Sequence, residues 1–218
     1  MPAKDLAANP SVRLAALLAA RLTHDISGLL GTTMGALELA HEDPGAGEEA
    51  LQLAVDAARE LGQRLRLLRA AWGPEGGPLG VADLAALAEG LPGRRRVQID
   101  LSALPSTAAF TPAAGRLLLN VLLLGAEALP GGGRVSLAGD AVREVVATIA
   151  GPRAAWPAGF AACLADEAAA WQALGGAREL QAPLTALLAR AGGLGLSFLM
   201  AAEAEASPPL LVRLAGPA

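Results

Sequence analysis

The residues best suited to chemistry lie together in one segment, RLTHDISGLLGTTMGALEL (residues 21–39), where His24 precedes Asp25. The chain has only two histidines. Imidazole changes charge near neutral pH, so its neutral form is a good nucleophile and acceptor. A neighbouring carboxylate can hydrogen-bond the far ring nitrogen, fix the tautomer and stabilise the imidazolium. We therefore expect His24 to be the catalytic nucleophile and Asp25 its partner.

A helix must carry this pair, because apolar residues recur at spacings of three and four through Leu22, Ile26 and Leu29. At about 100° per residue, His24 lies about 160° from both Leu22 and Ile26. The imidazole is therefore expected to point away from the apolar seam. A lone histidine in such a place is usually a solvated surface residue, so its neighbours decide how it is interpreted.

Small residues share the face of His24, at offsets of four, seven, eight and eleven. They are Gly28, Gly31, Thr32 and Gly35. Each glycine inside a helix costs about 1 kcal/mol relative to alanine. Either a neighbouring helix of the same protein packs tightly here, or a partner docks and brings a reactive group to His24. We expect partner docking, with Arg21 one turn earlier helping to neutralise an incoming phosphoryl group.

A second amphipathic stripe runs from Leu51 to Trp72, after a break at Pro44, Gly45 and Gly47. Asp43 is predicted to cap this helix, with Pro44 as its first residue. Residues 8–72 are thus predicted to form a long antiparallel helical hairpin. Two helices bury only one seam each, so we expect a homodimer that completes a four-helix bundle.

Residues 81–218 are predicted to form a second domain of mixed helices and strands after a Gly/Pro-rich linker at 73–80. The fold class is therefore α+β, with a sheet covered by helices. Helices are predicted at 81–90, 111–129, 158–171, 184–190 and 195–206. Strands are predicted at 95–101, 134–139 and 143–150, with an edge strand at 210–214.

The segment around His24 resembles the phospho-acceptor helix of two-component histidine kinases, and most closely that of the ChpT-type bacterial histidine phosphotransferases. In that family a His-Asp pair is followed by small residues and a GLEL-like ending, matched here by GALEL at 35–39. The proline usual in the family falls at Leu29, which removes an expected kink. The resemblance implies a dimerising hairpin, a kinase-like ATP-binding domain and control of the bacterial cell cycle.

The nucleotide site that this resemblance implies is dismantled. Active kinases hold Mg²⁺ and phosphates with two asparagines four residues apart, and here Asn120 is followed by Leu124. A leucine offers no oxygen to a hard cation. The adenine-binding Asp-x-Gly turn is replaced by Ala-Gly-Pro at 150–152, and a glycine run at 192–196 is a weak remnant. We expect a degenerate ATPase-like domain with no cofactor of its own.

The expected function is histidine phosphotransfer between the aspartates of receiver domains through phospho-His24. The expected partners are the receiver of a hybrid histidine kinase and response regulators, with Mg²⁺ held by the receiver. Two alternatives stay open: an ATP-dependent histidine kinase, and a non-catalytic dimeric adaptor. Nucleotide titration tests the first, and replacement of His24 by alanine tests the second.

Composition excludes other classes of function. A net charge of −4 and a pI near 5.2 argue against nucleic-acid binding. The only cysteine, Cys163, leaves no internal disulfide and fits a reducing cytoplasm. The longest apolar run, 117–129, is interrupted by Asn120 and Glu127, and no signal-peptide core precedes Lys4, so no membrane segment is expected. His41 lies 17 residues from His24, about 25 Å along a helix, and cannot share a metal with it.

Overall fold

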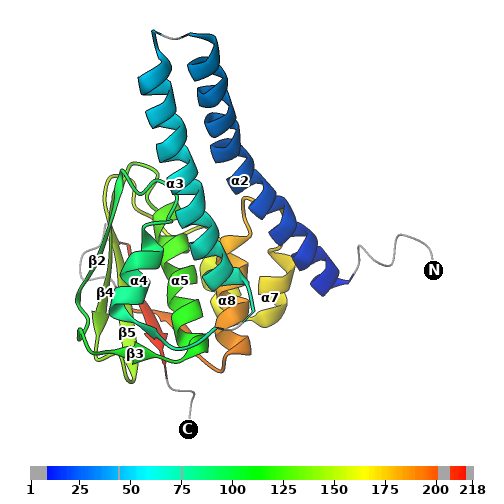
Figure 1. The fold of residues 1–218 in the computed structure, drawn as a ribbon. Coiled ribbons are helices and arrows are strands. Elements are labelled where there is room, and N and C mark those ends of the chain that lie inside the picture. Colours follow the sequence, from blue (N-terminus) through cyan, green and yellow to red (C-terminus); the bar gives the residue numbers. More distant parts are fainter. Residues whose placement is uncertain (1–8, 44, 75, 201–206, 215–218) are drawn as a thin grey trace.

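A computed structural model describes residues 9–43, 45–74, 76–200 and 207–214. Two long helices, α2 (Pro10–Glu42) and α3 (Gly47–Trp72), form an antiparallel hairpin that rises from a mixed helix and sheet domain (Figure 1). The chain is therefore α+β, with a long helical region before the sheet. In the described part of the chain, no helix is both long and apolar enough to cross a membrane.

The ends of the two hairpin helices follow from local chemistry. The Asn9 side chain accepts hydrogen bonds from the amides of Ser11 and Val12, and Pro10 occupies the first helical position. The predicted cap of α3 was wrong: Asp43 ends α2, its side chain bonds the Gly45 amide, and α3 begins only at Gly47. An Asp side chain that bonds the amide two residues on forms a turn rather than a helix cap. Pro44 lies outside the described residues.

The second domain is built on a five-stranded sheet of order β2-β4-β5-β7-β6. Its strands are β2 (Val97–Ala103), β4 (Gly133–Gly139), β5 (Glu144–Ala150), β6 (Gly195–Phe198) and β7 (Leu210–Arg213). Only β2 and β4 run parallel, with helix α5 (Pro112–Glu127) in the crossover between them. A small ladder joins β1 (Leu79–Gly80) to β3 (Ala109–Phe110). Helices α4 (Val81–Ala88), α6 (Phe160–Ala165), α7 (Glu167–Gln172) and α8 (Gln181–Ala191) complete the domain.

Three sequence predictions for this domain were wrong in detail. The helix predicted at 195–206 begins instead as strand β6, and residues 201–206 lie outside the described part. Short apolar runs fit either structure, and here pairing with β7 decides for a strand. Because β6 takes the edge, β7 lies inside the sheet instead of at its edge. The helix predicted at 158–171 is divided by Asp166, which caps α7.

Helix α5 is the centre of the core. It is covered on nearly every side, because it lies between the sheet, helix α8 and the end of the hairpin (Figure 1). Leu118, Leu122 and Leu124 have no exposed surface. A helix that is apolar all round is buried in a core in this way.

A buried polar cluster fastens α5 to the base of the hairpin. The Asn120 side chain has no exposed surface, and its Oδ1 accepts hydrogen bonds from Trp72 Nε1 at 3.1 Å and Gln181 Nε2 at 3.0 Å. Its Nδ2 donates to the carbonyls of Ala71 and Arg116, each at 2.9 Å. The Arg116 guanidinium also bonds carbonyls at the C-terminal end of α3. Every hydrogen-bonding position of the amide is thus used inside the protein.

This cluster predicts a large cost for a small change. Replacing Asn120 by alanine removes the acceptor of Trp72 Nε1 and one of the acceptors of Gln181 Nε2 from the core, which costs about 2–4 kcal/mol of unfolding free energy. Asn9→Ala is the matched control, because it removes only a helix cap and costs about 1 kcal/mol. Urea unfolding measures both variants. Equal losses would contradict the role of the Asn120 cluster.

Candidate functional site

The imidazole of His24 stands free on the side of α2, where 74% of its side chain is exposed. Its Nδ1 lies 3.3 Å from Asp25 Oδ1. When Nδ1 carries the proton and donates to this carboxylate, Nε2 is left as the unprotonated, exposed nitrogen. The geometry therefore presents one ring nitrogen to an incoming electrophile and holds the other against a carboxylate.

Asp25 is itself held in place by Arg21, one turn earlier. Arg21 Nε donates to both carboxylate oxygens of Asp25, at 3.1 and 3.2 Å. The Asp25 side chain is only 10% exposed, so a charge is needed beside it. Asp25 can therefore orient His24 because its own position is fixed from behind.

Arg21 also joins the helix to the second domain. Its other nitrogens donate to Glu127 Oε1 at 2.6 Å and to the Ala177 carbonyl at 3.3 Å. Burial raises the pKa of Glu127 despite the opposing effect of the Arg21 charge. The pKa of Arg21 is raised: burial, the largest influence, lowers it, but the charges of Glu127 and Asp25 outweigh burial. Neutralisation of a phosphoryl group by Arg21 stays a prediction, since this guanidinium already has two carboxylate partners.

A cavity of about 770 Å³ opens beside His24 at the junction of α2 and the second domain. Arg21, His24 and Asp25 line it from α2. The second domain contributes three charged residues that the sequence analysis missed, namely Glu127, Arg153 and Arg178. They lie more than 100 positions from His24, and no local pattern marks them. Only the tertiary fold brings them to the site.

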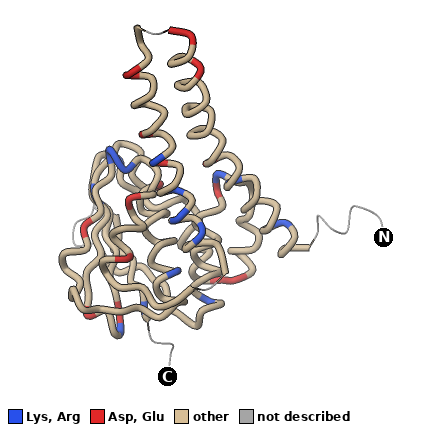
Figure 2. Tube along the Cα trace, in the orientation of Figure 1, with Lys and Arg blue, Asp and Glu red and all other residues tan. Residues whose placement is uncertain are grey.

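The small residues on the His24 face are open to solvent. Gly28, Gly31, Thr32 and Gly35 are all exposed, and a Cβ built on any of the three glycines would meet nothing within 4 Å in the part of the chain that the structure describes. Packing among the described residues therefore does not require these glycines. Figure 2 shows that the hairpin arm above the site carries little charge until its acidic tip. The result is a smooth face that leaves room for another backbone next to His24.

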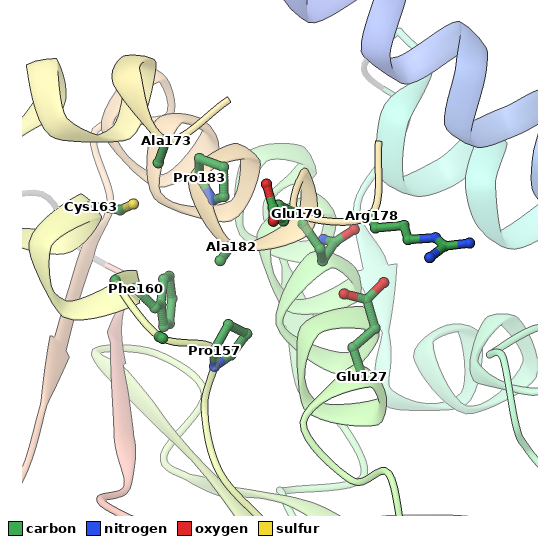
Figure 3. A pocket seen from close by; sticks show the side chains of 12 residues that line it. Glu127, Pro157, Phe160, Cys163, Ala173, Arg178, Glu179, Ala182 and Pro183 are labelled. Atoms are coloured by element: carbon green, nitrogen blue, oxygen red, sulfur yellow. The ribbon is translucent and has the colours of Figure 1, made fainter. Parts of the chain in front are cut away.

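A second cavity of about 370 Å³ lies behind Glu127, where α5, α6 and α8 meet (Figure 3). Phe160, Cys163 and Pro183 line it together with Glu179 and Gln181. Burial raises the pKa of the Cys163 thiol, so the nucleophilic thiolate is disfavoured there. The thiol is a core group and takes no part in the site at His24.

The residues that the sequence analysis compared with the nucleotide site of active kinases pack inside this fold. The Asn120 side chain is hydrogen-bonded to the hairpin, to α8 and to the Arg116 carbonyl of its own helix, and Leu124 is fully buried. Gly151 lies so close to the backbone of Gly132 that a Cβ there would collide with its carbonyl. The glycine run at 192–196 ends α8 and begins β6. Each of these residues has a structural role in this fold.

Three comparisons with known proteins bear on this site. Residues 81–204 match the family model for the histidine phosphotransferase C-terminal domain. The protein phosphotransferase ChpT of Brucella abortus (strain 2308) is 31% identical over 195 residues, which cover 87% of this chain and 91% of ChpT. A bacterial phosphotransferase of known structure at 1.7 Å superimposes with a TM-score of 0.68 and 28% identity, covering 98% of this chain and 97% of that one.

Fold and site thus define a phosphotransferase that is not an ATP-dependent kinase. The chain belongs to the ChpT-type histidine phosphotransferase family. Membership assigns it to histidine phosphotransfer in a phosphorelay, with receiver domains as partners.

The open glycine face yields a prediction for stability and a separate prediction for receiver binding. Gly31→Ala should raise the unfolding free energy by about 0.5–1 kcal/mol, because a helical glycine is replaced without a clash. Gly31→Leu should also fold, but it should raise the KM for a receiver domain by about tenfold, because the larger side chain would fill the face on which we expect the receiver to dock. Thermal unfolding and transfer kinetics measure the two effects.

The matched control is Gln52→Leu, an exposed position on α3, which should leave the KM within twofold of the wild-type value. An unchanged KM for Gly31→Leu would show that the receiver docks elsewhere.

Proposed function

We propose that His24 accepts a phosphoryl group from the aspartyl phosphate of one receiver domain and passes it to the aspartate of another. One observation carries this assignment: the imidazole is exposed on a face of small residues, while a fixed carboxylate lies beside its Nδ1. Gly28, Gly31, Thr32 and Gly35 would form the docking face. Arg21 would act by holding Asp25.

The transfer is an in-line substitution at phosphorus. Nε2 of neutral His24 attacks, a P–N bond forms, and the P–O bond to the receiver's aspartate breaks, which releases a carboxylate. The ring gains positive charge in this step, and Asp25 stabilises it through Nδ1–H. Most of the catalysis is positioning and charge neutralisation. The reverse reaction, with a second aspartate as nucleophile, completes the relay.

The receivers would supply the metal ion for the reaction. Mg²⁺ would be held in the acidic pocket of the receiver, and this chain would need no metal or cofactor of its own. The upstream partner would be the receiver of a hybrid histidine kinase, and the downstream partners response regulators. By family, the output would be control of the bacterial cell cycle. The compartment would be the reducing cytoplasm, where the single thiol of Cys163 stays reduced.

We further propose that the second domain is a nucleotide-binding fold whose site has been converted to packing. Asn120 would be the remnant of the Mg²⁺-binding pair, now committed to Trp72, Gln181 and the end of α3. Breaking these bonds to bind a cation would leave several buried groups unpaired. This argument makes phosphotransfer the better-supported function and the ATP-dependent kinase the weaker alternative. The proposed domains are residues 8–72 for dimerisation and phosphotransfer, and 81–218 for the converted fold.

We also propose a homodimer whose interface is the side of the hairpin opposite the His24 face. Apolar residues line one exposed stripe along both helices: Leu22, Leu30, Met34 and Leu37 on α2, with Leu51, Val55 and Leu65 on α3. An apolar groove of about 290 Å³ continues the stripe at the base, between Leu22 and Leu65. Exposed apolar patches of this kind mark association surfaces. A second copy that packs here would complete a four-helix bundle and leave the His24 face free.

The relay predicts a specific pattern of labelling. A receiver domain that carries labelled aspartyl phosphate should transfer its label to the wild-type protein, and His24→Gln should abolish this transfer. His41→Gln is the matched control and should retain transfer, since His41 lies at the tip of the hairpin. Labelled ATP should give no phosphorylated protein. Gel autoradiography measures the label in each of these reactions, and loss of the label in acid shows that it is on histidine.

Three outcomes would contradict the assignment. Label acquired from ATP alone would indicate a kinase. Transfer that persists in His24→Gln would place the acceptor elsewhere, and an adaptor would bind its receiver without acquiring label at all.

The dimer predicts a difference between two neighbouring leucines of α3. Leu51 and Leu53 are 53% and 51% exposed, but only Leu51 lies in the apolar stripe. Leu51→Glu should convert the dimer to monomer, because it buries a charge in the interface, whereas Leu53→Glu should leave the dimer intact. Analytical ultracentrifugation at micromolar concentration distinguishes the two. A monomeric wild-type protein would refute the bundle.

A further inference from the structure

Two arginines of the second domain line the same cavity as His24. Arg153 follows β5, and Arg178 precedes α8, so each belongs to a loop that the fold brings beside α2. Both side chains are exposed. Within the described ranges, neither guanidinium forms an ion pair. They differ in this respect from Arg21, whose charge is matched by Asp25 and Glu127.

The loop that carries Arg178 is tied directly to the helix of His24. The carbonyl of Ala177, the residue just before Arg178, accepts a hydrogen bond from Arg21 at 3.3 Å. Arg21 in turn bonds Asp25, which contacts the His24 ring. Figure 3 shows the Arg178 side chain extending from this loop toward the side of the hairpin. Its position is therefore coupled to His24 through a short chain of hydrogen bonds.

The backbone at Arg153 is unusual. Arg153 has φ of 58°, in the left-handed region that few residues other than glycine adopt. Such conformations are strained and gather at functional sites. The loop is held in place just before Arg153, because Gly151 packs on the backbone of Gly132. The guanidinium of Arg153 is thus presented at the cavity by a constrained loop.

The charged residues that line the cavity indicate the kind of ligand that these arginines bind. Three arginines and two carboxylates line the cavity, and the two carboxylates already share Arg21. A phosphoryl group on His24 would bring two negative charges and three acceptor oxygens into this space. Guanidinium groups match phosphoryl oxygens in geometry as well as in charge.

We propose that Arg153 and Arg178 are catalytic residues that bind the oxygens of the phosphoryl group as it forms or breaks its bond to His24. This inference rests on the proposed role of His24. The arginines keep their protons throughout and make or break no covalent bond. Their action is to stabilise the charge on the transferring group from the side of the second domain.

A small phosphodonor separates phosphoryl binding from protein docking. Phosphoramidate can phosphorylate histidine but has no receiver surface, so a residue that only docks the partner cannot affect its reaction. The variants are Arg153→Gln, Arg178→Gln and the double variant. Arg143→Gln is the matched control, since Arg143 is next to the opposite end of β5. Thermal unfolding checks that every variant folds.

The double variant should phosphorylate His24 with phosphoramidate at least about tenfold more slowly than the wild type, as expected when charge-assisted hydrogen bonds to a phosphoryl group are lost. Its transfer rate at saturating receiver should fall by a similar factor, while Arg143→Gln should stay within twofold.

An unchanged phosphoramidate rate with a raised KM for the receiver would overturn the inference and assign both arginines to partner docking. Wild-type rates in both assays would overturn it as well. If wild-type protein acquired no label on His24 from either donor, the proposed function itself would fail, and this outcome is distinct from the other two.

Discussion

The ion pair between Arg21 and Glu127 joins the two parts of this molecule at the site. One guanidinium bonds Asp25 on its own helix, Glu127 at the end of α5, and a carbonyl in the loop before α8. A partly buried pair of this kind adds little net stability, because desolvation offsets much of the attraction. Its directional bonds instead fix geometry. They hold Asp25 against the His24 ring and hold the second domain beside the same ring.

The different sides of helix α2 have different surroundings. The His24 side is smooth and open, and a partner's backbone can approach there because the glycines have no side chains. The side toward α3 is packed, and the remaining side exposes apolar residues that water disfavours. A continuous helix of 33 residues keeps these surfaces apart. The proposed docking of a receiver and the proposed packing of a second copy would therefore not compete for the same surface.

Asn120 shows how one buried amide can join two parts of a chain. A buried amide with four possible hydrogen bonds is costly unless all are satisfied, and here Trp72, Gln181 and the carbonyls of Ala71 and Arg116 satisfy them. The hairpin is thereby fastened to the second domain. Arg64 strengthens the same junction through the carbonyl of Gly90 at the end of α4. A fixed junction suits a site that is built from both parts of the chain.

The sequence by itself determined the elements with strong periodicity and the chemistry of one segment. The two long helices, α5 and the strands β4 and β5 were predictable because their apolar patterns extend over several turns or several alternations. His24, Asp25 and the glycine face were visible for the same reason, since a single helix fixes their relative positions. The family resemblance followed from that segment and is confirmed by the comparisons.

Tertiary structure decided the rest. The strand at 195–198 was mistaken for a helix because four residues are too few to show a period, and only pairing with β7 determines it. Arg21 was expected to face an incoming phosphoryl group, and the tertiary fold brings Glu127, 106 positions away, to pair with it. Arg153 and Arg178 carry no local signal at all. Contacts between distant segments depend on how the whole chain packs, so no pattern of neighbouring residues encodes them on its own.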